Sequence, residues 1–136
     1  MAALADTGFL LAVLADNDPQ HEICAQTLRQ EPHLLVSDVV LPELAYLILR
    51  DMNHQTLARF LRSVGEGRVE FLSTTRTDLL RAADLLEQYA DTRIDFVDCA
   101  IVALAERLGV TRILTVDRRH FTIVRPKHCA YFEILP

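Results

Sequence analysis

Apolar and polar positions along this chain follow two different periods. Short apolar runs, which predict buried strands, occur at about residues 2–5, 34–37, 68–72, 112–116 and 129–134. Helical spacing of apolar residues is found between them, at about 8–15, 19–30, 53–65, 75–90 and 95–108, and in a segment from just before Pro42 to about Arg50. This alternation predicts an α/β fold, in which helices cover both faces of a mostly parallel sheet of about five strands.

Two of the predicted helices have well-defined apolar faces. In 95–108 the face consists of Val97, Ile101, Leu104, Ala105 and Leu108. Asp95 is the predicted N-cap of this helix, and Gly109 is its predicted left-handed C-cap. In 75–90 the predicted buried face consists of Leu79, Ala83, Leu86 and Ala90.

Length, composition and cysteine content narrow the class of protein. The chain has 136 residues, 51% apolar and 24% charged, and no repeat or linker divides it, so we expect one globular domain over 1–136. No apolar run approaches the roughly 20 residues that span a bilayer, and the first residues lack the basic start of a secretory signal. Cys24, Cys99 and Cys129 lack C-x-x-C spacing, which favours a reducing compartment over a disulfide framework or a zinc site. We therefore expect a cytoplasmic protein.

Acidic residues stand where the predicted strands end and the helices begin. Asp6 ends the first strand, Asp117 ends the strand at 112–116, and Asp95 and Asp98 open the 95–108 helix. Glu43 lies in a helix whose other residues are almost all apolar. Because the carboxyl ends of parallel strands share one edge of a sheet, we expect these acids to converge there.

Each acid also has a separate structural explanation. Asp6 and Asp95 are suited to capping helices, and Asp98 is suited to the first turn of a helix, where the dipole favours negative charge. Asp117 is suited to starting a turn, and Glu43 to reaching solvent through a gap in the apolar face. These explanations do not account for acids from distant segments being predicted at one edge.

Converging carboxylates repel one another unless a cation lies between them. A site built only of oxygen ligands suits Mg²⁺ or Mn²⁺ better than zinc. Such an ion lowers the pKa of a bound water and offsets charge on a phosphodiester during hydrolysis. This chemistry needs no serine or cysteine nucleophile paired with a base, and none is evident here.

Two blocks of sequence resemble the carboxy-terminal half of PIN domains, and most closely that of the VapC-type ribonuclease toxins of bacterial toxin–antitoxin pairs. They are residues 95–106, DFVDCAIVALAE, and residues 115–121, TVDRRHF, with Gly109 between them. The resemblance continues through Asp6-Thr7, through the stretch from Asp18 to His21, and through the strand Leu34–Ser37 that leads to Glu43. It spans essentially the whole chain in the same order.

The resemblance implies a PIN-like three-layer α/β/α fold and a defined set of site residues. It assigns catalysis and metal binding to Asp6, Glu43, Asp98 and Asp117, and Asp95 matches a further metal-binding acid found in part of the family. Thr7 and Thr115 match supporting polar positions. It also implies endonucleolytic cleavage of RNA that depends on Mg²⁺ or Mn²⁺ and leaves 5′-phosphate and 3′-hydroxyl ends. The expected partners are a second copy of the chain and a VapB-like antitoxin whose tail covers the acidic site.

An acidic ribonuclease needs local positive charge to meet RNA. The net charge is −5, but residues 112–136 carry four Arg and one Lys against two acids. This basic stretch is either a contact for the phosphate backbone or a solvated edge. On the first interpretation, the expected RNA contacts are Arg112, Arg118, Arg119 and His120.

Three other functions compete with a toxin. A housekeeping RNA-processing nuclease would have the same site, and an inactive binding module would not need the complete set of acids. A phospho-receiver also places carboxylates at strand ends, but it requires a phospho-accepting Asp at the third strand and a Lys further on. Here the third predicted strand ends Glu70-Phe71-Leu72-Ser73, and the only lysine is Lys127.

Overall fold

A parallel sheet forms the centre of the protein in a computed structural model that describes residues 1–136. Its strands are β1 (Ala3–Ala5), β2 (Leu34–Ser37), β3 (Glu70–Leu72), β4 (Arg112–Leu114) and β5 (Glu133–Leu135). They lie in the order β3-β2-β1-β4-β5, and every neighbouring pair is parallel. In the central strand, Leu4 pairs with Leu35 on one side and Ile113 on the other. The predicted five-stranded α/β fold is confirmed.

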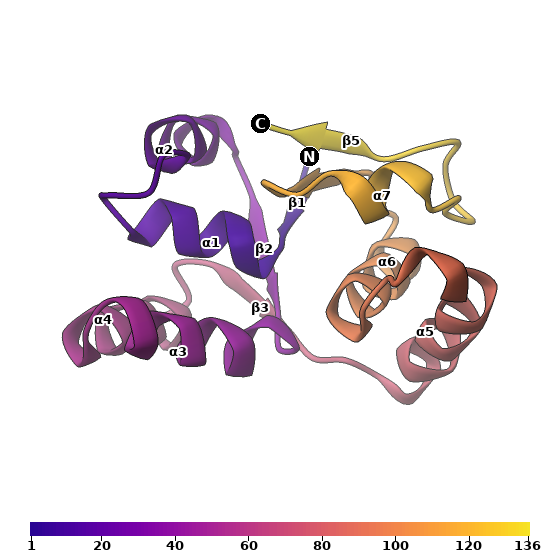
Figure 1. Ribbon diagram of the computed structural model, residues 1–136, viewed down its shortest axis with the longest axis horizontal. Coiled ribbons are helices and arrows are strands. Elements are labelled where there is room, and N and C mark those ends of the chain that lie inside the picture. Colours follow the sequence, from indigo (N-terminus) through magenta and orange to yellow (C-terminus); the bar gives the residue numbers. More distant parts are fainter.

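Helices cover both faces of this sheet. They are α1 (Thr7–Leu14), α2 (His21–Gln30), α3 (Val40–Asp51), α4 (His54–Gly65), α5 (Arg76–Gln88), α6 (Phe96–Leu108) and α7 (Arg119–Ile123), with a short 3₁₀ turn, η1, at Ala90–Thr92. Figure 1 shows α1 to α4 on one side of the sheet and α5 to α7 on the other, which gives three layers. None of the helices is both long enough and apolar enough to cross a membrane.

The core is built around β1 and α6. All three residues of β1 are fully buried, because the strand is central and both of its faces are covered. In α6, every residue from Cys99 to Ala105 is buried. Both predicted caps of this helix are confirmed, since the Asp95 side chain accepts a hydrogen bond from the Asp98 N–H and Gly109 has φ of 71°. These caps fix the position where α6 begins.

Helix α5 presents a different face to the core from the one predicted. Leu79 and Leu86 are exposed, and the buried positions are Asp78, Ala82 and Leu85. Asp78 lies in this face because it caps its own helix at Thr75 and pairs with Arg107 of α6, whose Nε lies 3.0 Å from Asp78 Oδ1. The buried face of α5 is therefore the one that carries the ion pair with α6, and not the one that its apolar pattern predicts.

Other boundaries also differ from the predictions. Helix α2 begins at His21 rather than Pro19, because the Asp18 side chain accepts a bond from the Gln20 N–H and forms a turn there. The last strand begins at Glu133, where its N–H reaches the Thr111 carbonyl at 2.8 Å, and not near residue 129. As predicted, α3 starts just before Pro42, in the first turn, where a missing N–H leaves no helical bond unmade.

Candidate active site

The candidate site lies at the carboxyl edge of the sheet, where β1 and β4 end side by side. Asp6 follows β1 directly, and its N–H donates to the carbonyl of Leu114, the last residue of β4, at 3.0 Å. Thr115 and Asp117 follow β4. The order of the strands reverses at β1, so successive crossovers run in opposite directions from this point. Ligands in open α/β sheets bind at such reversals.

Asp6 is held by two hydrogen bonds, one to each of its carboxylate oxygens. Oδ1 accepts from the Phe9 N–H at 2.9 Å and so caps α1, while Oδ2 accepts from the Thr115 hydroxyl. The side chain is almost fully buried. Burial raises the pKa of Asp6 to about 6, although both hydrogen bonds oppose the shift, and the negative charges of Asp98 and Asp117 raise it further. Each oxygen keeps a second lone pair that a ligand can use.

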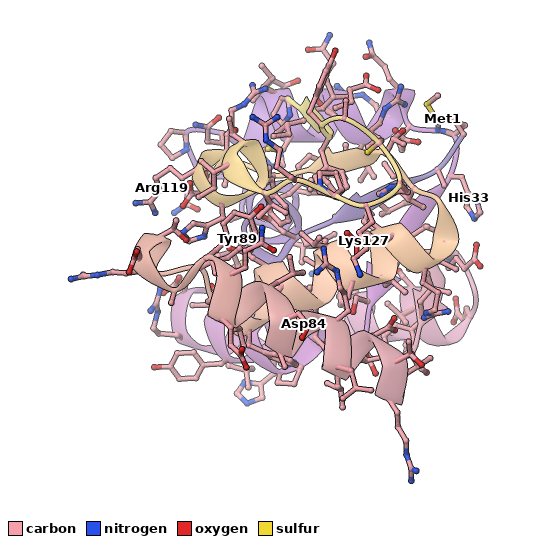
Figure 2. The ribbon with its side chains drawn as sticks, turned by 90° about the vertical axis from the view of Figure 1, so that its right-hand side faces the viewer. Met1, His33, Asp84, Tyr89, Arg119 and Lys127 are labelled. Atoms are coloured by element: carbon pink, nitrogen blue, oxygen red, sulfur yellow. The ribbon has the colours of Figure 1, made fainter.

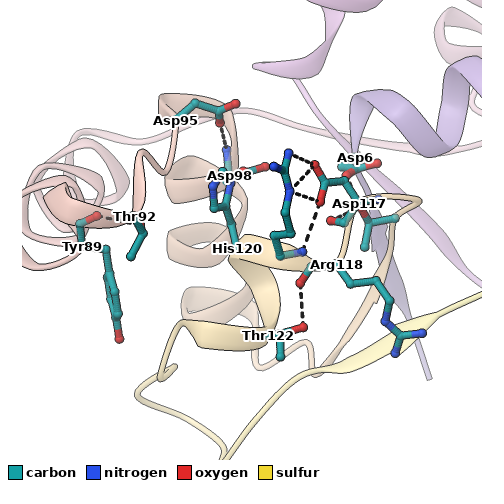
Figure 3. Close-up of polar contacts among 11 residues, drawn as sticks. Asp6, Tyr89, Thr92, Asp95, Asp98, Asp117, Arg118, His120 and Thr122 are labelled. Carbon is teal, nitrogen blue, oxygen red and sulfur yellow. Dashed lines mark hydrogen bonds and ion pairs between the residues drawn. The ribbon is translucent and has the colours of Figure 1, made fainter.

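Asp98 stands in the first turn of α6, beside the N-cap residue Asp95. Its Oδ2 lies 2.6 Å from Nδ1 of His120, and both side chains are mostly buried. Burial raises the pKa of Asp98 to about 6; the hydrogen bond from His120 lowers it, and the charges of Asp95 and Asp117 raise it. Figure 3 shows Asp98 and His120 close together, with Asp6 and Asp117 on the other side of the site.

Asp117 has a different environment from the other acids. It is half-exposed, and its carboxylate accepts hydrogen bonds from the Arg119 guanidinium, at 2.9 Å to Nε and 2.6 Å to Nη2. These bonds lower the pKa of Asp117 to about 2. Asp117 is therefore ionised in neutral solution, and the guanidinium of Arg119 offsets its negative charge.

Glu43 and Thr7 complete the set of predicted residues at this edge. Glu43 is exposed on the first turn of α3 and lines the same cavity as Asp6 and Asp98. One explanation of Glu43 was that it points to solvent through a gap in the apolar face. It does reach solvent, but it does so in the cavity that the other acids line. Thr7 also lines the cavity, and its hydroxyl is buried without a hydrogen-bond partner. Such an unpaired buried hydroxyl is costly to the fold.

A cavity of about 200 Å³ joins these residues. It is lined by Asp6, Thr7, Gly8, Glu43, Asp95, Val97, Asp98, Val116, Asp117, Arg119 and His120. The structure therefore brings together all five acids that the resemblance assigns. The carboxylates of Asp6, Asp98 and Asp117 are each bonded to other side chains of the protein. No group of three or more acidic, histidine or cysteine side chains is arranged to hold an ion without adjustment.

Two of the arginines expected to bind RNA do not line the cavity. Arg112 is at the amino end of β4 and pairs with Glu31 and Glu133, at 3.0 and 3.2 Å. Arg118 donates to the backbone carbonyls of Ile134 and Pro136, so it links the segment after β4 to the segment around β5. Both guanidinium groups are engaged elsewhere in the chain, so the structure does not bring these two arginines into the cavity. Arg119 and His120 do line the cavity.

Helix α7 and the ion pairs that it brings to the site were not predicted from the sequence. The structural explanation of Asp117 was that it starts a turn; the structure has a short helix after it, anchored by the buried Phe121. Gly8 was also missed: a Cβ at this position would lie 3.1 Å from Val116 Cγ2, so glycine allows α1 to approach the loop after β4. Only the buried Phe121, within a polar stretch, could have signalled the helix.

Comparison with known proteins identifies the family. The PIN-domain family profile matches residues 3–125. Over 134 residues, 98% of this chain and 99% of the other, the sequence is 32% identical to Ribonuclease VapC26 of Mycobacterium tuberculosis. This chain is a PIN-domain protein of the VapC family.

Solved structures share the PIN fold over nearly the whole chain. VapC20 of Mycobacterium tuberculosis, described as a sarcin–ricin loop cleaving toxin, has a TM-score of 0.82 at 19% identity, with 98% of this chain and 99% of that chain covered. A toxin–antitoxin complex from Klebsiella pneumoniae has a TM-score of 0.70 at 17% identity, with 96% and 98% covered. The PIN-like three-layer architecture expected from the sequence is confirmed.

Proposed function

We propose that this protein is an endoribonuclease that depends on Mg²⁺ or Mn²⁺ and acts as the toxin of a toxin–antitoxin pair. One observation carries the proposal: five carboxylates from four separate segments line one cavity, together with only one guanidinium, that of Arg119, and one imidazole, that of His120. The repulsion among these acids is offset most directly by a divalent cation. The relatives support the reaction, since VapC26 is named a ribonuclease and VapC20 is described as an RNA-cleaving toxin.

The residues of the cavity fit a hard divalent ion. Asp6, Glu43 and Asp98 supply carboxylate oxygens to it, and the one histidine in its lining, His120, is bonded to Asp98 through Nδ1. Oxygen ligands suit Mg²⁺ and Mn²⁺, whereas a zinc site would use cysteine or histidine. Binding would require Asp98 and Asp117 to share their oxygens between the ion and His120 or Arg119.

A bound ion supplies a water of lowered pKa and positive charge beside the scissile phosphate. The chain itself orients the ligands. The Phe9 N–H and the Thr115 hydroxyl fix both oxygens of Asp6, and Asp95 fixes the first turn of α6 that carries Asp98. Arg119 stands at the exposed rim, where its guanidinium can meet a phosphate oxygen. The acidic remainder of the chain limits non-specific attraction to RNA.

We further propose that the protein forms a homodimer and binds a VapB-like antitoxin. The proposal rests on family membership and on the structural relative from Klebsiella pneumoniae, which is a toxin–antitoxin complex. A housekeeping nuclease with the same site would cleave RNA without stopping growth. Expression of the parent chain in a host that lacks the antitoxin should therefore arrest growth, and co-expression of the small protein encoded beside it should restore growth.

Cleavage of RNA by the purified protein tests the proposed reaction. We expect the parent chain to cut a structured RNA in Mg²⁺ or Mn²⁺ and to stop when EDTA is added. Asp98→Asn keeps the size of the side chain but removes its charge, so cleavage should fall by at least about 100-fold while circular dichroism is unchanged. Glu22→Gln, an exposed acid on α2, is the matched control. Parental activity in Asp98→Asn, or full activity in EDTA, would refute the proposal.

A further inference from the structure

His120 and Asp98 form the most enclosed histidine–carboxylate pair in the protein. Their side chains are 18% and 16% exposed, and 2.6 Å separates Nδ1 from Oδ2. His33 and Glu70 lie equally close, but each is about half-exposed, and His21 is 3.8 Å from the fully exposed Asp16. Water competes least at His120, so its hydrogen bond is the strongest of the three.

The ionised state of the carboxylate decides which of the two groups donates this hydrogen bond. An ionised carboxylate only accepts, so Nδ1 of His120 carries the hydrogen and donates it to Asp98 Oδ2. Nε2 of the ring and Oδ1 of Asp98 make no hydrogen bond within the chain. The imidazole therefore holds one oxygen of Asp98 and leaves the other without a partner in the chain, and both residues line the cavity.

Asp98 depends on this bond more than Asp6 depends on any single partner. Asp6 is anchored at both oxygens, by Phe9 and Thr115. The carboxylate of Asp98 has only His120, and it stands beside the like charges of Asp95 and Asp117. Without the imidazole, its side chain would turn away from those charges and toward solvent.

The ring is itself held firmly in place by its helix. His120 precedes Phe121, which is 1% exposed and packs edge-on against Phe132 at a centroid distance of 6.4 Å. Arg119 on the same helix is 80% exposed and bonds to Asp117, so it cannot replace the histidine at Asp98. Helix α7 therefore presents the imidazole to Asp98 from a fixed backbone.

We propose that His120 is a positioning residue: its Nδ1–H holds Asp98 in the orientation that binds the divalent ion, and its contribution does not come from contact with RNA. This inference rests on the proposed metal-dependent function. It replaces the expected RNA-binding role of His120 with one exerted through a carboxylate. Hydrogen-bond partners of metal ligands commonly change metal affinity by about 10- to 100-fold.

Three substitutions of His120 test whether the hydrogen-bond donor at the position of Nδ1 is what matters, and not the rest of the imidazole ring. His120→Asn places an amide N–H near the position of Nδ1, whereas His120→Gln places it near Nε2 and His120→Ala removes it. Calorimetric titration with MnCl₂ should show affinity about 10-fold weaker for the Gln and Ala variants, and close to parental for the Asn variant. RNA cleavage by the Gln and Ala variants should recover as Mn²⁺ is raised to saturation.

A control variant and two readouts keep the outcomes distinct. His33→Ala removes the other close pair, at the amino end of the sheet, and Figure 2 shows His33 and Arg119 on opposite sides of the molecule. This variant should bind Mn²⁺ like the parent. Parental affinity in both the Gln and Ala variants, equal loss in the Asn and Ala variants, or a cleavage defect that persists at saturating Mn²⁺ would overturn the role of His120. Failure of the parent chain to bind Mn²⁺ would instead overturn the metal site, and this inference with it.

Discussion

Asp6 contributes to the fold and to the candidate site with the same carboxylate. One oxygen caps α1, and the other joins β1 to β4 through Thr115. Burial and the neighbouring charges of Asp98 and Asp117 oppose ionisation of this carboxylate, so the pKa of Asp6 rises to about 6 in spite of the two hydrogen bonds. Sites that bind ligands commonly contain such residues, which are arranged for the bound state rather than for stability of the free protein.

Asp6→Asn should therefore stabilise the metal-free protein in neutral solution. The folded state of the parent has a pKa of about 6 against an ordinary 3.8, so it holds the proton more tightly than the unfolded state. Stability from this group is present at low pH and is lost as the pH rises through 6, by up to about 3 kcal/mol. Asparagine keeps the cap and does not ionise. Urea unfolding in EDTA should show similar stability for the two proteins at pH 4 and a more stable variant at pH 8.

A variant less stable than the parent at pH 8 would contradict this account of Asp6. The slope of stability between pH 4 and 6 should become smaller in Asp6→Asn without vanishing, because Asp98 has a similarly raised pKa.

Contacts between elements decide which residues reach the site and which remain structural. Helices α5 and α6 are joined by two ion pairs, Asp78 with Arg107 and Glu106 with Arg81. They fix α6, whose first turn carries Asp98, against its neighbour. On the same side of the sheet, the short α7 owes its place to buried Phe121 and brings Arg119 and His120 to the acids.

Arg107→Ala should destabilise the protein strongly. It leaves the Asp78 carboxylate, of which only 3% is exposed, without the guanidinium that offsets its burial. Loss of one partner from a buried pair costs about 3–5 kcal/mol, and the lower end applies here because water reaches part of Arg107. Urea unfolding measures the change. Arg50→Ala, which breaks an exposed pair with Asp51, should leave the unfolding midpoint unchanged. Equal effects from the two variants would show that the pair between the helices is not a structural requirement.

At the scale of the whole molecule, the strand order brings acidic side chains from distant segments of the chain to one edge of the sheet. Reversal at β1 brings the ends of β1 and β4 together, and α3 and α6 add Glu43 and Asp98 from opposite layers. The cavity therefore concentrates negative charge within a chain that is already acidic. Its affinity for a cation depends on how many of these acids are ionised.

Divalent ions should accordingly stabilise the folded protein in a manner that depends on pH. On the proposed function, Mn²⁺ would bind the assembled acids and not the unfolded chain, so it should raise Tm, and EDTA should reverse the rise. Asp6 and Asp98 have pKa values of about 6, so the increase should be large at pH 7.5 and small at pH 5. Differential scanning fluorimetry measures both. The same increase at the two pH values, or in Asp98→Asn, would place the bound ion elsewhere.

The sequence by itself determined the features that depend on neighbouring residues. The alternation of strands with helices, the caps Asp95 and Gly109, and the start of α3 before Pro42 appear where the local pattern predicts them. The acids could be located in the same way, since a parallel sheet requires the residues that follow its strands to lie at one edge.

Only the tertiary structure decided the features that depend on distant partners. Arg112 was expected at the site, but it meets Glu31, 81 residues away, at the opposite end of its strand. The buried face of α5 follows from Asp78 reaching Arg107 on another helix. The link between His120 and Asp98 likewise joins two elements. Local patterns specify which way a side chain points along its own helix or strand, whereas the partner that neutralises a charge is fixed only when the elements pack together.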